Sequence, residues 1–135
     1  MGKVQIVTDS TAYFTKEYIE QNDIKVVPLS VTFSGETREE GFPGEFDEFY
    51  HKLESSKDFP TTSQPPIEAF VKVYEEILAN GREIVTIVIS EKLSGTYNSA
   101  TVAANMTQPD KISVIDSETT VTNLKMLVMI ANDMA

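Results

Sequence analysis

The sequence predicts an α/β protein built on a largely parallel sheet with helices on both faces. Apolar, strand-like segments alternate with helical segments, and chains of this kind connect parallel strands by right-handed crossovers. Residues 83–89 (EIVTIVI) are almost continuously β-branched, which is typical of a central strand covered on both faces. We therefore expect one α/β domain over residues 1–135, with ligands bound outside the carboxyl ends of its strands.

The first elements are predicted from short apolar runs and the turns between them. Residues 3–8 (KVQIVT) are expected to form a strand, followed by the turn Asp9-Ser10-Thr11 and a helix over residues 15–21. The next strand is expected over residues 24–32 (IKVVPLSVT). Pro28 places this strand at a sheet edge or marks a bulge, because proline donates no backbone hydrogen bond.

The acidic stretch 36–48 holds six carboxylates and one arginine. We interpret it as a solvated loop and helix start, because it lacks the alternate ligand spacing around a turn glycine that oxygen-ligand cation sites need. A helix over residues 46–53 should follow. Its apolar side chains recur at i, i+3, i+4 and i+7, which predicts a buried stripe made of Phe46, Phe49, Tyr50 and Leu53.

The second half of the chain continues the alternation of helices and strands. A loop with three prolines spans residues 57–66, and Pro66 suits the start of a helix over residues 67–80 that Gly81 would terminate. After the strand at 83–89, a polar turn leads into a helix over about 95–106. A buried strand at 111–115 and an apolar helix at 122–134 complete the prediction.

Composition excludes several classes of function. The chain carries 11 basic and 21 acidic side chains, a net charge of −10, and its basic residues are scattered, so nucleic acid and anionic membrane surfaces are not expected partners. The absence of cysteine excludes thiolate chemistry and cysteine-based metal sites, and the single His51 excludes a histidine-rich one, so no metal is expected. We expect a soluble, cytoplasmic protein.

Hydroxyl and carboxylate side chains gather where the predicted strands end. Anions are favoured at helix starts by free backbone N–H groups and by the helix dipole, and hydroxyls can add hydrogen bonds to them. An anion site is therefore one interpretation, and ordinary helix capping is the other. The residues involved are Asp9 and Ser10, Thr62 and Ser63, Ser94, Gly95 and Thr96, and Asp116 and Ser117.

A catalytic site is the less favoured interpretation of these residues. A nucleophilic Ser94 would need a general base within reach, and His51 falls in a helix elsewhere in the chain. Asp9 or Asp116 could supply a carboxylate base, which leaves a small-molecule enzyme open as an alternative. No phosphate loop, dinucleotide-binding turn or HExxH helix occurs. A binding site without covalent chemistry fits the residues best.

Five segments in order resemble the DegV family of bacterial fatty-acid-binding proteins: VTDST at 7–11, VPL at 27–29, PTTSQP at 60–65, LSGTY at 93–97 and IDS at 115–117. This resemblance implies an apolar tunnel for one long-chain fatty acid, whose carboxylate would be bound by Thr62 and Ser94. It implies no catalytic residue, metal or cofactor here. It also implies that a separate kinase subunit phosphorylates the carboxylate that the DegV-type protein presents.

Members of that family are about twice as long as this chain. The resemblance therefore implies that the chain corresponds to the N-terminal portion alone, without the second domain and part of the tunnel. Apolar surface would then be exposed where the second domain docks, and we expect self-association through it. Besides the fatty-acid carrier and the enzyme, a ligand-free fragment that keeps only a protein-binding surface stays open as a third interpretation.

Overall fold

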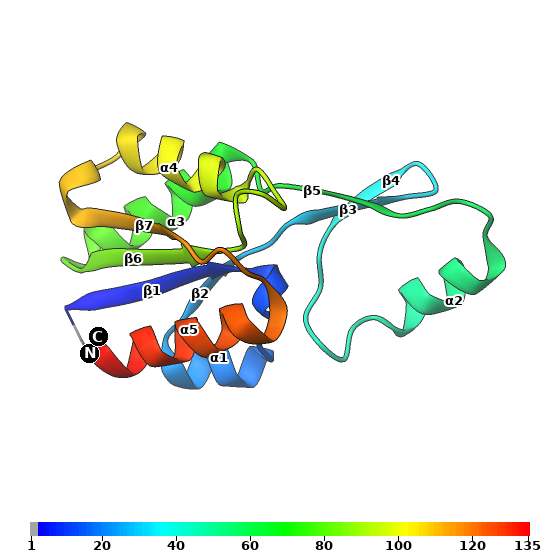
Figure 1. Cartoon of the computed structure of the whole chain (residues 1–135), viewed down its shortest axis with the longest axis horizontal. Helices are drawn as coiled ribbons and strands as arrows, with labels where there is room; N and C mark the ends of the chain where they lie inside the picture. Colours follow the sequence, from blue (N-terminus) through cyan, green and yellow to red (C-terminus); the bar gives the residue numbers. More distant parts are fainter. Residues whose placement is uncertain (1–2) are drawn as a thin grey trace.

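The computed structural model of the chain describes residues 3–135, and its main sheet is wholly parallel (Figure 1). The strand order is β2-β1-β6-β7. β2 therefore pairs with one edge of β1, whereas β6 and β7 extend the sheet from its other edge. The bounds of these strands are Val4–Asp9 for β1, Lys25–Val27 for β2, Glu83–Val88 for β6 and Ile112–Asp116 for β7. The predicted fold class is confirmed.

Helices cover both faces of the main sheet. α3 (Ile67–Ala79) and α4 (Thr96–Met106) lie on one face, and α1 (Lys16–Asn22) and α5 (Val121–Met134) lie on the other (Figure 1). Side chains alternate across a strand, so Val7 of β1 packs in the α3–α4 layer whereas its neighbour Ile6 packs in the α1–α5 layer. Short 3-10 helices follow β1 (Ser10–Ala12) and precede β7 (Pro109–Lys111).

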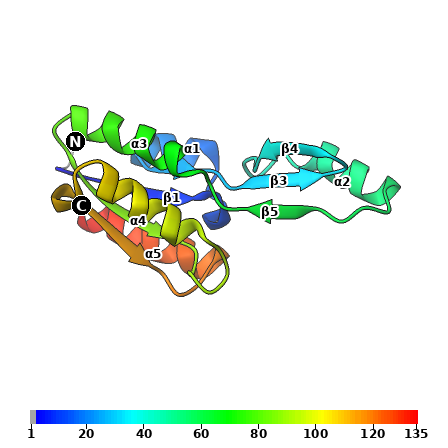
Figure 2. The same cartoon turned by 90° about the horizontal axis from the view of Figure 1, so that it is seen from above.

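A second, smaller sheet projects from the end of the main one (Figure 2). It contains β3 (Ser30–Phe33), β4 (Glu36–Glu39) and β5 (Thr61–Ser63) in the antiparallel order β4-β3-β5, and α2 (Asp47–Ser55) connects β4 to β5. We call this part, residues 30–63, the arm. β5 is followed by α3, so the arm is a single insertion between β2 and α3 of the main domain.

The structure corrects the prediction of one strand over residues 24–32. The chain leaves the main sheet at Pro28, and the two halves of the segment belong to different sheets, as β2 and β3. Proline offers no N–H for continued pairing, which explains why the break falls there. The first four residues of the acidic stretch are also not a loop, because Glu36–Glu39 pairs with β3 as β4, whereas the rest is a loop and the start of α2.

Two predictions of burial were wrong. No residue of α2 is buried, and Tyr50 keeps 54% of its surface exposed, because α2 lies beside the small sheet of the arm and not against the main core. The aromatic stripe still contacts that sheet through the edge-to-face pair of Phe33 and Phe49. β7 is an edge strand, so Ile115 is 45% exposed instead of buried.

Other local predictions are confirmed. β6 lies between β1 and β7 in the interior of the sheet, and Gly81 ends α3 in the left-handed conformation at φ 75°. The Thr15 side chain caps α1 by accepting a hydrogen bond from the Tyr18 N–H at 3.2 Å. Among the helices of residues 3–135, none is long and apolar enough to cross a membrane.

Candidate ligand site

The carboxyl ends of β1, β6 and β7 adjoin one another, as the sequence predicted. The backbone N–H of Ser117 donates to the Val88 carbonyl at 3.2 Å, which continues the β6–β7 pairing past the end of the strands. The Asp116 carboxylate accepts the N–H groups of Glu91 and Glu118 through one oxygen, Oδ1, at 3.3 and 2.9 Å. Ser117 forms a local turn with Thr119. Asp116 and Ser117 thus organise the β6 and β7 loops.

Asp9 is fully buried between the ends of β1 and β6. Its Oδ1 accepts the Thr11 N–H at 2.7 Å and the Thr11 hydroxyl at 2.6 Å, and its Oδ2 accepts the Ile89 N–H at 2.7 Å. Burial raises the pKa of Asp9, and the three hydrogen bonds oppose that rise. Both oxygens accept hydrogen bonds, so Asp9 joins the two strand ends.

Ser10 connects the main sheet to the arm. Its hydroxyl accepts the Leu29 N–H at 3.0 Å and donates to Oε2 of Glu40 at 3.3 Å. Tyr13 also contacts the arm through Glu40 and through an edge-to-face pair with Phe46. Burial, followed by the hydrogen bond and the charge of Glu40, raises the pKa of Tyr13 to about 12, so this phenol stays protonated at neutral pH.

The two predicted carboxylate-binding residues lie on neighbouring segments. Ser94 is half-buried just before α4, and its hydroxyl is 2.8 Å from that of the fully buried Thr96. Thr62 lies in β5 and is exposed. The segments meet at Gly95, because an ideal Cβ placed on Gly95 would lie 2.7 Å from the side-chain carbon Cδ of Gln64. The structure therefore brings the TTSQ and SGT motifs into contact.

One aspect of the sequence interpretation was wrong for Thr62 and Ser63. They belong to a β-strand paired with β3, whereas the following helix α3 begins only at Ile67 with Pro66 as its N-cap. The helix start nearest the two hydroxyls is therefore that of α4, beside Ser94 and Gly95, and its Thr96 N–H donates to the Ser94 hydroxyl at 3.3 Å. Register places Thr62 opposite Val31, so the two side chains share one face of the small sheet.

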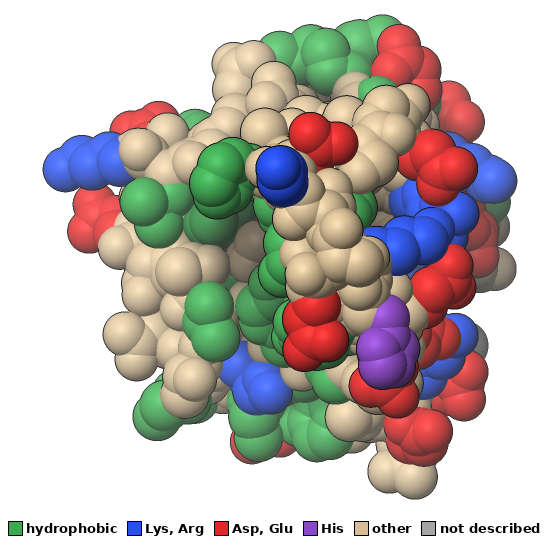
Figure 3. All heavy atoms as spheres, turned by 90° about the vertical axis from the view of Figure 1, so that its right-hand side faces the viewer, with side chains coloured by type: hydrophobic (Ala, Val, Ile, Leu, Met, Phe, Trp, Pro, Cys, Tyr) green, Lys and Arg blue, Asp and Glu red, His purple; other side chains and the backbone are tan. Residues whose placement is uncertain are grey.

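A pocket of about 630 Å³ lies in the arm, between this face and α2. Thr62 lines it together with apolar side chains that come from β3, from α2 and its approach, and from the segment before β5. Figure 3 looks onto this end of the molecule and shows apolar side chains bordered by acidic and basic ones. The apolar lining residues are Val31, Phe33, Phe46, Phe49, Tyr50 and Pro60.

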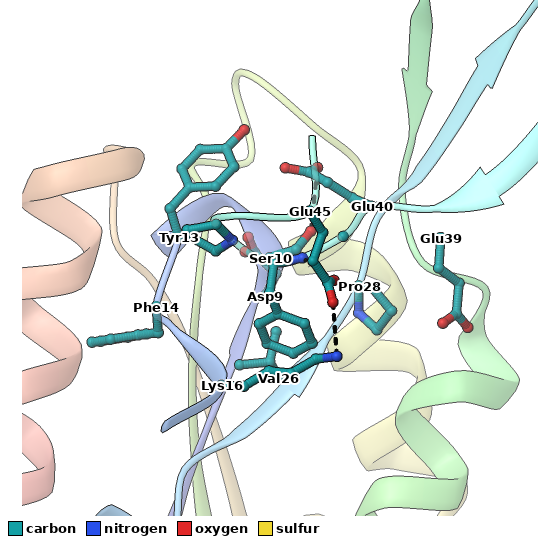
Figure 4. A pocket seen from close by; sticks show the side chains of 13 residues that line it. Asp9, Ser10, Tyr13, Phe14, Lys16, Val26, Pro28, Glu39, Glu40 and Glu45 are labelled. Carbon is teal, nitrogen blue, oxygen red and sulfur yellow. Dashed lines mark hydrogen bonds and ion pairs between the residues drawn. The ribbon is translucent and has the colours of Figure 1, made fainter. Parts of the chain in front are cut away.

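A second pocket of about 390 Å³ lies at the ends of β1 and β2 and includes Asp9 and Ser10 in its lining (Figure 4). Lys16 and Glu45 form an ion pair across it at 2.8 Å. Tyr13, Glu39, Glu40, Gly41 and Glu45 line both pockets, so the chain after β4 separates them. Sequence reasoning missed Tyr13 and Glu40, because it treated Glu40 only as part of an acidic run and had no signal for the contact with Ser10.

The arrangement supplies hydroxyl groups, helix-start amides and an apolar pocket. Residues 3–135 contain no group of three or more His, Cys, Asp and Glu side chains that could hold a metal ion. His51 lies exposed on α2 in the arm, while Ser94 lies at the start of α4. The fold thus defines an α/β protein whose arm carries an apolar pocket, with the candidate hydroxyls of Thr62 and Ser94 on segments that meet where the main sheet joins the arm.

A family model described as the DegV family of uncharacterised proteins matches residues 3–135. The chain therefore belongs to the DegV family, and the resemblance inferred from its motifs is confirmed.

Curated and solved relatives agree with this assignment. The chain is 43% identical over 118 residues to a DegV domain-containing protein of Staphylococcus aureus, an alignment that covers 87% of this chain and 42% of the relative. It is 41% identical to a DegV domain-containing 15.5 kDa protein of the same species, over 87% of this chain and 83% of that protein. The chain thus spans less than half of the longer relative and most of the shorter one.

A solved structure from Eubacterium ventriosum, described as a fatty-acid (stearic acid)-binding protein, superposes on this chain with a TM-score of 0.88. The two sequences are 35% identical, and the match covers 99% of this chain and 47% of the solved one. The DegV fold is therefore present over nearly the whole chain, and this relative takes a fatty acid as its ligand.

Because Asp9 uses both carboxylate oxygens, we expect Asp9→Asn to destabilise the fold. The amide would place an N–H₂ group against a backbone N–H or the Thr11 hydroxyl, and the lost bond should lower the free energy of unfolding by about 2 kcal/mol. Urea denaturation measures the change. Asp116→Asn is the matched control, because Asp116 accepts only through Oδ1 and an amide keeps that acceptor. Equal losses for both variants would contradict this role of Asp9.

Proposed function

We propose that this chain binds a long-chain fatty acid without catalysing a reaction, and that the hydroxyls of Thr62 and Ser94 hold its carboxylate. The observation that carries the proposal is the contact of Gln64 with Gly95, which joins the segments bearing these hydroxyls beside a pocket that Thr62 lines. The stearic acid-binding relative from Eubacterium ventriosum, 35% identical over almost the entire chain, supports the choice of ligand.

Neutral donors suit this ligand. The cationic groups lining the arm pocket are already paired, because Arg38 lies 2.9 Å from Glu36 and Lys52 lies 3.3 Å from Glu48. Hydroxyls and the start of α4 can bind a carboxylate without a full countercharge, since free helix-start N–H groups carry partial positive charge. In this proposal Ser63, Gly95 and Thr96 support the site as neighbours of the two binding hydroxyls.

The other supporting residues act through the framework. Asp9 holds the ends of β1 and β6 together, and Asp116 and Ser117 shape the loops beside Ser94. Ser10 fixes the arm to the main sheet through Leu29 and Glu40. None of these four residues needs to touch the ligand for the site to form.

The acyl tail is assigned to the arm pocket. Val31 shares the face of the small sheet with Thr62, and the ring of Phe49 packs against Phe33 at a centroid distance of 5.7 Å. Burial of an acyl chain here would contribute about 0.8 kcal/mol for each methylene removed from water. The exposed aromatic stripe of α2 gains a partner in this arrangement, since it forms the wall opposite β3.

In this proposal the chain is a cytoplasmic carrier that presents the acid to a separate kinase subunit. The carboxylate oxygen would attack the γ-phosphorus of ATP held by the kinase, and ADP would leave as the acyl phosphate forms. A carboxylate bound by hydroxyls and helix-start N–H groups stays more nucleophilic than one paired with arginine or lysine. The chemistry of the site therefore suits transfer to the bound ligand by a partner.

Replacing Thr62 and Ser94 together with alanine should abolish fatty-acid retention. Each substitution removes one hydrogen-bond donor to a charged group, which is worth about 1.5–3 kcal/mol, so we expect a loss of affinity of roughly a hundredfold or more. Native mass spectrometry of protein purified from bacterial cells should show a long-chain acid on the unmodified protein only.

Thr61→Ala is the control, because Thr61 lies on the opposite face of β5 and pairs with Thr32. Thermal unfolding should confirm that all variants fold. Unchanged retention in the double variant would rule out the assignment of the two hydroxyls.

The proposal also assigns self-association to the exposed side of α5. Leu124 and Val128 of this helix are buried against the sheet, whereas Met126 and Ile130 each keep 55% of their surface exposed and Leu127 keeps 42%. Contiguous apolar surface of this kind usually marks an interface. The family includes a 15.5 kDa relative of similar size. In this proposal a second copy of the chain covers the exposed side of α5.

The double variant Met126→Glu/Ile130→Glu should therefore be monomeric where the unmodified chain is dimeric. Two carboxylates in each copy would face one another across a symmetric interface, and their desolvation would oppose association. Sedimentation equilibrium at several concentrations measures the change. Lys72→Glu on α3 is the control, because it alters the net charge by the same two units on the other face of the sheet. A strictly monomeric unmodified chain would contradict this part of the proposal.

A further inference from the structure

Gly95 is the point where the arm meets the start of α4. An ideal Cβ on Gly95 would lie 2.7 Å from Cδ, 2.8 Å from Nε2 and 2.9 Å from Oε1 of Gln64. The three distances are nearly equal, so the Gln64 carboxamide turns its face toward the position that a Cβ of residue 95 would occupy. Any side chain at position 95 would force the carboxamide away.

The glycine at position 95 is explained by this contact and not by backbone conformation. Gly95 has φ −77° and ψ 7°, values close to those of the third residue of a type I turn, which do not require glycine. Gly35, Gly44 and Gly81 differ, because each has a positive φ and nothing within 4 Å of its ideal Cβ. At Gly95 the missing side chain instead allows close packing against a side chain from the arm.

The residues before and after Gln64 restrict its backbone. Ser63 before it pairs with Ser30 in β5, and Pro65 after it is buried and restricts the backbone. Packing of the carboxamide on Gly95 therefore fixes how far β5 lies from the start of α4. Thr62 lies two residues before Gln64, and Ser94 lies one residue before Gly95, so the contact joins the backbones that carry the two hydroxyls.

We infer that Gln64 is a positioning residue, which sets the separation of the Thr62 and Ser94 hydroxyls by packing its carboxamide flat on Gly95. This inference rests on the proposed function, since it gives Gln64 a role in the same carboxylate site. Ligand affinity should then depend on the shape and charge at position 64, although the exposed Gln64 contributes little to the stability of the fold.

A double-mutant cycle separates positioning from simple filling of space. Gly95→Ala should lower fatty-acid retention with little change in the melting temperature, because the added Cβ displaces the carboxamide of an exposed, flexible side chain. Gly95→Ala/Gln64→Ala should not recover retention, because the clash is gone but the carboxamide that sets the separation is lost. Gln64→Ala alone should fold normally and bind fatty acid on the order of tenfold more weakly, a typical coupling between neighbouring residues.

Gln64→Glu tests the location of the carboxamide without changing its shape. A negative charge beside the site should weaken binding of palmitate but not of hexadecanol, which carries no charge, while the melting temperature stays unchanged. Gln108→Glu, on an exposed residue beyond the far end of α4, is the control for the charge change and should leave both ligands unaffected.

Three results would overturn the inference. The first is full retention by Gln64→Ala and Gln64→Glu while Thr62→Ala/Ser94→Ala loses the ligand, an outcome that leaves the proposed function intact. The second is recovery of retention in Gly95→Ala/Gln64→Ala, which would show that Gln64 only fills space beside Gly95. The third is retention by Thr62→Ala/Ser94→Ala, which refutes the proposed function itself and with it the site that Gln64 would position.

Discussion

The buried carboxylate of Asp9 is the interaction on which the rest of the site depends. In parallel sheets the crevice for ligands opens where the chain changes direction, which here is between β1 and β6. Asp9 fills this position itself, because its two oxygens take up the N–H groups of Thr11 and Ile89. These N–H groups are therefore unavailable to an external anion, and the proposed site uses hydroxyls farther out, where β5 of the arm meets α4.

Because the proposed site lies away from the end of β1, the main sheet and the arm each contribute different parts of it. The main sheet supplies a rigid edge and the start of α4, while the arm supplies a second hydroxyl and apolar walls. Glu40 connects them, since it accepts from Ser10 at the end of β1 and lies in the segment that separates the two pockets. One carboxylate of the acidic stretch 36–48, that of Glu40, therefore helps to hold the arm on the main sheet. Most of the other carboxylates of this stretch are exposed to solvent.

The sequence predicted elements whose signals are local and missed features that depend on distant contacts. The β-branched run of β6 and the terminating Gly81 could be read directly, because burial on two faces and a positive φ each demand particular residues. Pro28 was recognised as a disturbance, but whether a proline bends a strand or sends its second half into another sheet depends on later segments. The contact of Gln64 with Gly95 joins residues about thirty positions apart, and neither residue type reveals it alone.

The wrong prediction for α2 has a more specific cause. Helical periodicity shows that one face of a helix is apolar, but it does not show what covers that face. In α2 the stripe contacts a small sheet through Phe33 and otherwise lines a pocket, so its residues are partly exposed while the pattern is that of a core helix. A helix that borders an apolar pocket and a helix that borders a core require the same spacing. The proposed acyl chain would therefore replace the missing core layer, which is why the same pattern supports both interpretations until the structure is known.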